Sequence, residues 1–151
     1  MPITLTLPEP PSLNKMLSLA MQRTRRTRNG GWTTRVVPGI VYDQHHEAYV
    51  LRCTAALRQA KIVVPQTSWQ RWEMTAAHFR LHNLRDPFEL LAGLKWVVDW
   101  LVFVGFAAND SPREVRSIPT PTQEICRTNR GVTITIVPLP NVPKQNVGSS
   151  L

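Results

Sequence analysis

The amino-terminal part of the chain begins with an alternation of apolar and polar residues. Ile3–Leu7 alternates apolar side chains with threonines, which predicts a β-strand. The prolines that follow end this strand, because proline has no N–H group to donate to a sheet. We expect a loop at Ser12–Asn14. From there to Val41 the sequence has turn residues and little periodicity, so no regular element is predicted in that stretch.

The middle of the chain shows helical periodicity twice. Apolar residues recur at helical spacing in Gln44–Lys61, which predicts a first helix, and Trp72–Leu81 alternates well enough for a strand. Asp86 then has the position of an N-cap residue, with proline next and Glu89 three residues on, and a helix to about Val104 follows. The predicted buried face of this helix consists of Leu90, Leu91, Leu94, Val97, Val98 and Leu101.

The carboxyl-terminal part of the chain predicts strands and then a tail. Glu114–Ile118 and Gly131–Val137 are strand candidates, joined through Gln123–Arg127. The order strand, helix, strand, long helix, strand, strand predicts an α/β fold, with a mixed β-sheet packed by two main helices. We therefore expect one small domain over residues 1–138 and a flexible tail over residues 139–151, which lack periodic apolar positions.

The charge of the chain changes this picture by favouring an anionic partner. The 151 residues are 42% hydrophobic, enough for one folded core, and 18 Lys and Arg outnumber 10 Asp and Glu to give a formal net charge of +8. Fourteen of the cations are arginines, whose planar guanidinium suits bidentate contact with phosphate. No acid lies between Glu9 and Asp43. We predict DNA contact, with a solvated loop as the alternative, for the cations of that stretch: Lys15, Arg23, Arg25, Arg26, Arg28 and Arg35.

Other classes of protein fit the sequence less well. Cys53 and Cys126 are too few and too far apart for a disulfide framework or a zinc cluster, so free thiols are expected. The amino terminus lacks a basic region followed by a long apolar stretch, so no secretory signal is predicted. The most apolar segment, Trp96–Ala108, is shorter than the roughly 20 residues that a bilayer requires and contains Asp99. We expect this segment to be a buried helix and no membrane partner.

The residues able to carry chemistry gather around the long predicted helix. Asp86 and Glu89 lie at its start, and Asp110 lies just past its end. Lys95 and Asp99, four residues apart, share one of its faces. Carboxylates on a basic protein suggest a Mg²⁺ site for phosphodiester cleavage, because hard cations prefer oxygen ligands and the metal both activates water and offsets phosphate charge. A lysine beside them would stabilise the developing oxyanion.

Each of these residues also has a purely structural explanation. Asp86 and Glu89 fit a helix cap. Lys95 and Asp99 fit an ion pair within the helix, and Asp110 fits a turn before a proline. Asp86 and Asp110 lie at opposite ends of the helix. They would converge only if the chain after the helix folds back along it, if strands bring Asp110 there, or if a second subunit completes the site.

Histidines are weaker candidates for a metal site. The chain has an adjacent pair, His45 and His46, and a second pair four residues apart, His78 and His82. No cysteine or third histidine is suitably placed beside either pair, so we expect these side chains on the surface or on a strand face.

Several motifs together resemble one known family. The run Arg85–Leu101 (RDPFELLAGLKWVVDWL), followed by Gly105–Phe106 and Asn109–Asp110, resembles the core motif of the RusA-like Holliday junction resolvases. The segment Pro10–Asn14 (PPSLN), after the first strand, resembles that family's Pro-Pro-Ser-x-Asn loop. A helix and a terminal strand also fall where that fold expects them. The similarity spans about residues 3 to 137.

The resemblance implies roles for particular residues. Matched position by position, Asp86 corresponds to the first motif aspartate and Asp110 to the last acid, both of which are metal ligands in the family. Lys95 matches the family's helix lysine, and Asp99 matches the helix aspartate four residues later. The resemblance therefore implies Asp86, Lys95 and Asp110 as catalytic residues and Mg²⁺ as the cofactor. It also adds Asn14, in the matched loop, to the residues expected to contact DNA.

Three positions depart from the family pattern. Phe88 stands where the family has its second metal-binding aspartate, Glu89 stands where an asparagine should follow, and Asn109 replaces the first acid of the terminal pair. Because Phe88 cannot bind a metal, either Glu89 substitutes through a rearrangement of the first helical turn or the site is crippled. The metal-ligand set expected on this basis is Asp86, Glu89 and Asp110.

The resemblance implies an endodeoxyribonuclease that cuts branched DNA in recombination and repair. A homodimer is expected, because a two-fold protein can place one site on each of two strands of a four-way junction. The alternative is a RusA-like protein that binds junctions without cutting them, and a third class is a small basic protein that associates with RNA. Resolvases of this kind are often phage-borne, so the cytoplasm of a bacterial cell and a phage or prophage origin are expected.

Overall fold

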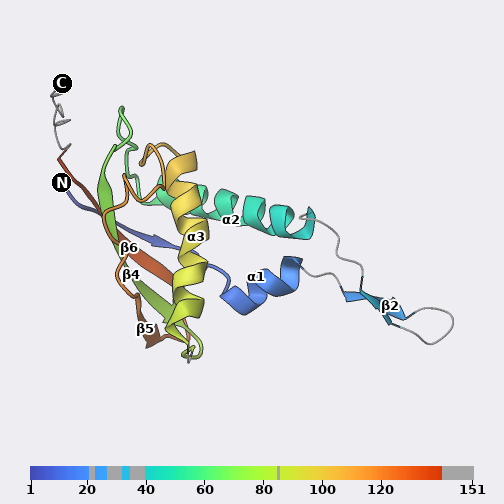
Figure 1. Cartoon of the computed structure of the whole chain (residues 1–151). Helices are drawn as coiled ribbons and strands as arrows, with labels where there is room; N and C mark the ends of the chain where they lie inside the picture. The colour runs from blue at the N-terminus through green and yellow to red at the C-terminus, as the bar shows by residue number, and fades with distance from the viewer. Residues whose placement is uncertain (21–22, 27–31, 35–39, 85, 141–151) are drawn as a thin grey trace, which may run out of the picture.

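The computed structural model describes residues 1–20, 23–26, 32–34, 40–84 and 86–140. Over these residues the chain forms a small mixed α/β domain with a four-stranded mixed sheet and three helices (Figure 1). The elements in chain order are β1 (Ile3–Leu7), α1 (Leu13–Ala20), β2 (Arg23–Arg26), β3 (Trp32–Thr34), α2 (Ile40–Gln59), β4 (Trp72–Arg80), α3 (Pro87–Phe103), β5 (Thr122–Ile125) and β6 (Gly131–Pro138).

The main sheet has the strand order β1-β6-β4-β5. β6 pairs antiparallel with both β1 and β4, whereas β5 pairs parallel with β4. The register places Leu5 opposite Ile134 and Met74 opposite Ile136, so apolar side chains of three neighbouring strands share one face. β2 and β3 pair with each other in a separate antiparallel sheet of two strands.

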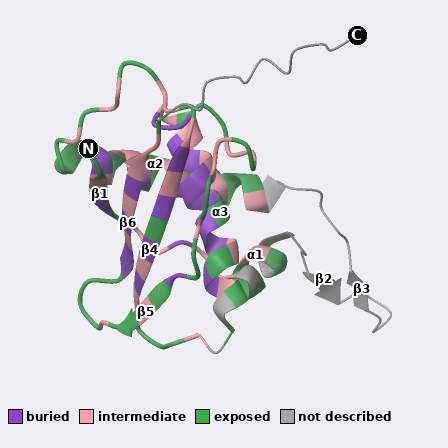
Figure 2. Ribbon diagram, turned by 60° about the vertical axis from the view of Figure 1, so that its left-hand side comes forward, coloured by how far each residue is buried: buried purple, intermediate pink, exposed green. Residues whose placement is uncertain are grey.

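The two faces of the main sheet differ in what covers them. The three helices lie over one face, where Ile134 and Ile136 of β6 are buried (Figures 1 and 2). The opposite face carries exposed threonines of the neighbouring strands, and the hydroxyl oxygens of Thr4 and Thr135 lie 3.0 Å apart there. Antiparallel strands commonly have one packed and one solvated face, which explains the alternation seen in the sequence.

The long helix α3 begins and ends as its sequence predicts. The side chain of Asp86 accepts a hydrogen bond from the backbone N–H of Phe88 at 2.8 Å, and proline occupies the first helical position. The helix ends at Val104, after which Gly105 adopts a φ of 91°, a left-handed conformation that glycine tolerates best. Most of the predicted buried face is confirmed, with Leu91 left partly exposed, because the core contains Leu90, Leu94, Val97, Val98 and Leu101.

The stretch between the first strand and Val41 is more regular than the sequence predicts. A helix, α1, begins at Leu13, where we expected a loop. Ser12 provides the reason, because its side-chain oxygen accepts a hydrogen bond from the backbone N–H of Lys15 at 3.3 Å, as a helix N-cap does. The β2–β3 hairpin was not predicted, and α2 begins at Ile40 rather than Gln44.

The carboxyl-terminal strands also differ from the prediction. Glu114–Ile118 does not form a strand of the sheet. Its contact with the sheet is at the start of β4, where Trp72 donates to Glu114 and accepts from Arg116, each at 2.9 Å. Two prolines follow this segment and prevent further pairing. The expected connection Gln123–Arg127 instead contributes to β5. The predicted strands at β1, β4 and β6 are confirmed.

Three other expectations concern the two thiols, membrane-spanning helices and the carboxyl-terminal tail. Cys53 and Cys126 are both free thiols, as expected. Within the described ranges, no helix is long and apolar enough to cross a membrane. In the predicted tail, Leu139 still donates a backbone hydrogen bond to Arg71 at 2.9 Å, and residues 141–151 lie outside the described part of the chain.

Candidate functional site

A cluster of one lysine and two aspartates lies on the exposed side of α3. The ammonium nitrogen of Lys95 donates to Oδ1 of Asp99 at 2.6 Å and to Oδ2 of Asp110 at 2.5 Å. The Lys95 side chain is 55% exposed and the two aspartate side chains about one third, so solvent and a ligand reach all three. We call these residues the lysine–aspartate cluster. It brings together two of the three predicted catalytic residues, Lys95 and Asp110.

The turn after α3 places Asp110 beside Lys95. The left-handed Gly105 redirects the chain, and Phe106 is then completely buried in the core. The indole N–H of Trp72 donates to the carbonyl oxygen of Asn109 at 3.2 Å, which fixes the residue before Asp110 to β4. The chain after the helix therefore folds back along α3, one of the alternatives that the sequence leaves open.

Lys95 and Asp110 stabilise each other in their charged forms. The hydrogen bond from Lys95 holds the pKa of Asp110 below its ordinary value. The same bond and the bond to Asp99 raise the pKa of Lys95. Both shifts favour the charged forms. One ammonium therefore sits between two carboxylates, which leaves the cluster with a formal excess of one negative charge.

The other two predicted metal ligands lie elsewhere on α3. Asp86 caps the helix, and its Cα lies nine residues before Lys95, about 13 Å along the helix axis. Glu89 accepts a hydrogen bond from the side-chain amide of Asn14 at 2.9 Å. Phe88 is 70% exposed and contributes no ligand. The structure therefore brings Asn14 to Glu89 and Lys95 to Asp110, but it does not bring Asp86 to the lysine–aspartate cluster.

The donor chemistry of these residues fits Mg²⁺ in one place. Across the described ranges, no three His, Cys, Asp or Glu side chains lie close enough together to hold a metal ion. Asp86, Glu89 and Asp110 of one chain thus do not fit as a joint ligand set. Asp99 and Asp110 both approach the same Lys95 nitrogen, so their oxygens lie close together. Mg²⁺ is usually held by one or two carboxylates together with waters and substrate phosphates, so this pair would hold it once the Lys95 ammonium between them moves aside.

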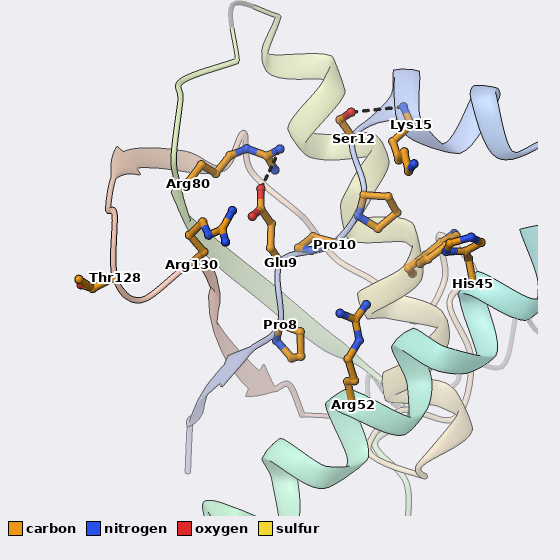
Figure 3. A pocket seen from close by; sticks show the side chains of 12 residues that line it. Pro8, Glu9, Pro10, Ser12, Lys15, His45, Arg52, Arg80, Thr128 and Arg130 are labelled. Atoms are coloured by element: carbon orange, nitrogen blue, oxygen red, sulfur yellow. Dashed lines mark hydrogen bonds and ion pairs between the residues drawn. The ribbon is translucent and has the colours of Figure 1, made fainter.

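The predicted DNA-binding residues fall in three places. Arg23, Arg25 and Arg26 belong to β2, whose backbone the structure describes, and Arg28 and Arg35 lie outside the described residues. Asn14 and Lys15 lie on the first turn of α1, where Lys15 lines an open cavity of about 650 Å³ (Figure 3).

Sequence reasoning missed the other cations of this cavity. Arg52 of α2, Arg80 at the end of β4 and Arg130 before β6 line it together with His45. These residues are far apart in the sequence and belong to no motif, so only the tertiary structure shows that they converge. Of the histidines, His45 and His82 are exposed, as expected, whereas His78 is completely buried and neither of its ring nitrogens has a hydrogen-bond partner among the described residues.

Two comparisons with known proteins find no relative of this chain. A scan of the sequence against protein-family models finds no match, and a search of curated proteins finds no similar sequence.

Proposed function

We propose that this protein is a RusA-like endodeoxyribonuclease that acts on branched DNA with the help of Mg²⁺. The observation that supports this proposal best is the meeting of Lys95 and Asp110, which lie fifteen residues apart in the sequence and were matched separately to the family motif. Both lie at the surface, where a DNA strand can reach them. The net charge of +8 supports a polyanionic substrate.

Each member of the lysine–aspartate cluster has a task in this proposal. Asp99 and Asp110 would hold Mg²⁺, which supplies an activated water and offsets the charge of the phosphate when it is bound. The lowered pKa of Asp110 favours its ionised form, which is the form in which a carboxylate binds a hard cation. Lys95 keeps its proton, because its pKa is raised, and it offers N–H donors to a phosphate oxygen as negative charge develops there.

A homodimer fits the proposed substrate. One chain carries one lysine–aspartate cluster, whereas resolving a four-way junction requires cuts in two strands. A two-fold dimer would place two clusters on the junction at symmetric positions. A second chain could also bring Asp86 or Glu89 near the cluster of its partner. The proposal places this activity in the cytoplasm of a bacterial cell, with a phage or prophage as the source of the gene.

Nicking of a synthetic four-way junction tests the proposal. With Mg²⁺, the wild-type protein should cut two symmetric strands, and Asp110→Asn should reduce the rate by about 100-fold or more, because it removes a metal ligand and the ionised partner of Lys95. Glu124→Gln, an exposed carboxylate on β5, removes the same charge elsewhere and should cut normally. Absence of cutting in the wild type, or equal cutting by both variants, would contradict the proposal.

A second candidate function is junction binding without cleavage. It is favoured by the helix start, where Asp86 is used as a cap, Glu89 accepts from Asn14, and Phe88 replaces a motif aspartate. Phe88→Asp decides between the two functions. Because the Phe88 side chain is 70% exposed, this substitution leaves the core intact. It should raise the cleavage rate of a damaged enzyme, whereas tight junction binding with no cutting by either form supports the second function.

Competition binding at one salt concentration tests the third class, a small basic protein that associates with RNA. If duplex or single-stranded RNA displaces the junction as effectively as unlabelled junction does, the protein is an RNA-associated protein, and the proposal of branched DNA as substrate is wrong.

A further inference from the structure

The cavity beside α1 is built from segments that are distant in the sequence. The residues Pro8–Ser12 after β1 form one wall, and α1, α2, the end of β4 and the turn before β6 supply most of the rest (Figure 3), with Trp96 of α3 beneath them. Gly93 of α3 allows this wall to pack closely, because a Cβ atom there would lie 2.6 Å from the carbonyl oxygen of Pro11. The cavity is therefore part of the folded domain and not a gap beneath a loop.

Positive charge dominates the lining of the cavity. Four cationic side chains face one carboxylate, Glu9, among the residues that line it. Glu9 accepts an ion pair from Arg80 at 2.8 Å, and the Arg80 side chain is only 13% exposed. Glu9 thus orients Arg80 and balances its charge. The cations are Lys15, Arg52, Arg80 and Arg130. We call this site the cationic cavity.

The helix α2 presents its basic side to the cavity and its acids elsewhere. His45 and Arg52 are seven residues apart, which places them on one face of the helix. Asp43 and Glu47 are each two residues from His45, about 200° around the helix axis, so they face away. The guanidinium of Arg52 lies 5.9 Å from the ring centre of Tyr49, which is buried, and this contact holds the arginine in place.

These features select the phosphodiester backbone as the ligand. Guanidinium groups pair with phosphate oxygens through two parallel hydrogen bonds, and three arginines surround this cavity. Its volume of about 650 Å³ exceeds what one phosphate needs, and the cavity is open, so a strand can enter and leave. The one tryptophan in the lining, Trp96, is 2% exposed and offers no surface for stacking on a base. Contact would therefore be with backbone and independent of sequence.

We infer that the cationic cavity holds phosphodiester groups of the DNA strand that leads to the lysine–aspartate cluster. α1 links the cavity to α3, because Lys15 lines the cavity and its neighbour Asn14 hydrogen-bonds to Glu89 of α3, the helix that also carries Lys95 and Asp99. The inference rests on the proposed function for the identity of the polyanion as DNA. It assigns backbone binding to Arg52, Arg80 and Arg130, which lie outside the stretch Lys15–Arg35 that the sequence singles out.

Two double variants with equal charge test this inference. Arg52→Gln with Arg130→Gln removes two exposed cations of the cavity. Arg58→Gln with Arg127→Gln removes two exposed cations from the same helix and the same turn, outside the cavity. Arg80 is left unchanged, because its ion pair with Glu9 is largely buried. Circular dichroism and thermal unfolding check that both double variants are folded.

The readout is the affinity for a fluorescent four-way junction, measured by anisotropy in EDTA over a range of salt concentrations. The cavity variant should bind at least about tenfold more weakly. Its slope of log K against log salt should fall by about 2, because each of the two arginines neutralises one phosphate in the wild type. The control variant should change affinity by less than about threefold. Equal losses in the two variants would overturn the inference and show that only the overall charge matters.

The same data separate this inference from the proposed function. If the wild type binds plain duplex as well as the junction, the preference for branched DNA is wrong, but a selective loss in the cavity variant still supports backbone binding in the cavity. If the wild type prefers the junction and the two variants behave alike, the proposed function stands and the cavity assignment fails. A wild type that binds neither DNA overturns both.

Discussion

Two polar regions flank α3, and they are built in opposite ways. The lysine–aspartate cluster comes from one helix and the turn that follows it, and its charges nearly balance within the protein. The cationic cavity comes from several segments that are distant in the sequence, and one carboxylate lies among four cations in its lining. The first region carries a formal excess of one negative charge, whereas the second presents the exposed Arg52 and Arg130 in a concave site.

The difference in charge indicates which region gains more from binding an anion. Exposed ion pairs contribute little to stability, so Lys95, Asp99 and Asp110 can be rearranged at small cost when a metal or a phosphate arrives. Several like charges held together repel one another, and the cationic cavity therefore gains from an anion that neutralises them. We expect the cavity to set DNA affinity and the lysine–aspartate cluster to set cleavage.

Gly93→Ala has the largest expected effect and acts on the cavity side alone. The new Cβ would lie 2.6 Å from the backbone oxygen of Pro11, so the wall Pro8–Ser12 must move away from α3. We expect the free energy of unfolding to fall by about 3 kcal/mol in urea denaturation. Junction affinity should fall as well, while the pKa of Asp110, followed by carboxyl NMR, stays low. Wild-type stability would show that the wall does not pack as described.

Acid pH is expected to destabilise the folded protein through the buried His78 of β4. Burial, with a smaller contribution from the charge of Arg80, lowers the pKa of His78 to about 4. The unfolded chain then binds more protons than the folded chain below the ordinary histidine pKa of about 6.5. Stability is therefore lost as the pH falls from about 6.5 toward 4, by about 2 kcal/mol between pH 7 and pH 5.

Denaturant unfolding of His78→Leu at pH 7 and pH 5 checks this expectation. The variant should lose most of the difference between the two pH values, because a buried leucine has no proton to gain. His82→Leu, at an exposed position, should keep the wild-type difference. A difference that persists in His78→Leu would place the acid sensitivity in another group.

Glu9→Gln separates two effects of the Glu9 carboxylate, which pairs with Arg80 and also lowers the positive charge of the cationic cavity. Arg80 would keep its charge in a largely buried position without an ionised partner, so we expect a loss of about 1–2 kcal/mol in stability. Junction affinity should instead increase by about threefold, because a negative charge leaves the binding site. Anisotropy and urea denaturation measure the two effects, with Glu124→Gln as the charge-matched control. A weaker affinity would show that orienting Arg80 matters more than the net charge.

Lys95→Met is expected to have the smallest effect on stability, at most about 1 kcal/mol, because its ion pairs are exposed. The pKa of Asp110 should rise, since Lys95 is what lowers it and Asp99 remains nearby. Carboxyl NMR titration measures this rise, and Lys61→Met, another exposed lysine, should leave it unchanged. A pKa of Asp110 that stays low without Lys95 would mean that other donors hold the carboxylate ionised.

The sequence predicted those elements whose signals are local. The first strand, β4, α3 and β6 are confirmed because alternation, capping and helical periodicity arise from neighbouring residues. The Asp86 cap and the break at Gly105 belong to the same kind of signal. α1 and the segment Glu114–Ile118 were predicted wrongly. In α1 the N-cap Ser12 was overlooked, and the second segment pairs only with the start of β4, which is distant in the sequence, because two prolines follow it.

In the candidate site too, one contact could be predicted from neighbouring residues and the other could not. The residues of α3 that meet, Lys95 and Asp99, are four apart and could be paired from the sequence alone. The sequence left open whether the chain after the helix brings Asp110 toward Asp86, and the turn after Gly105 instead brings Asp110 to Lys95.

The amino-acid sequence by itself determined the net positive charge, the ends of α3 and the alternation that divides the sheet into two faces, because each depends on composition or on residues within one element. Only the tertiary structure decided that Arg52, Arg80 and Arg130 share a cavity and that Asp86 stays apart from Asp110. The physical reason is that charges on different segments interact through space, and their separation is set by how the helices pack on the sheet.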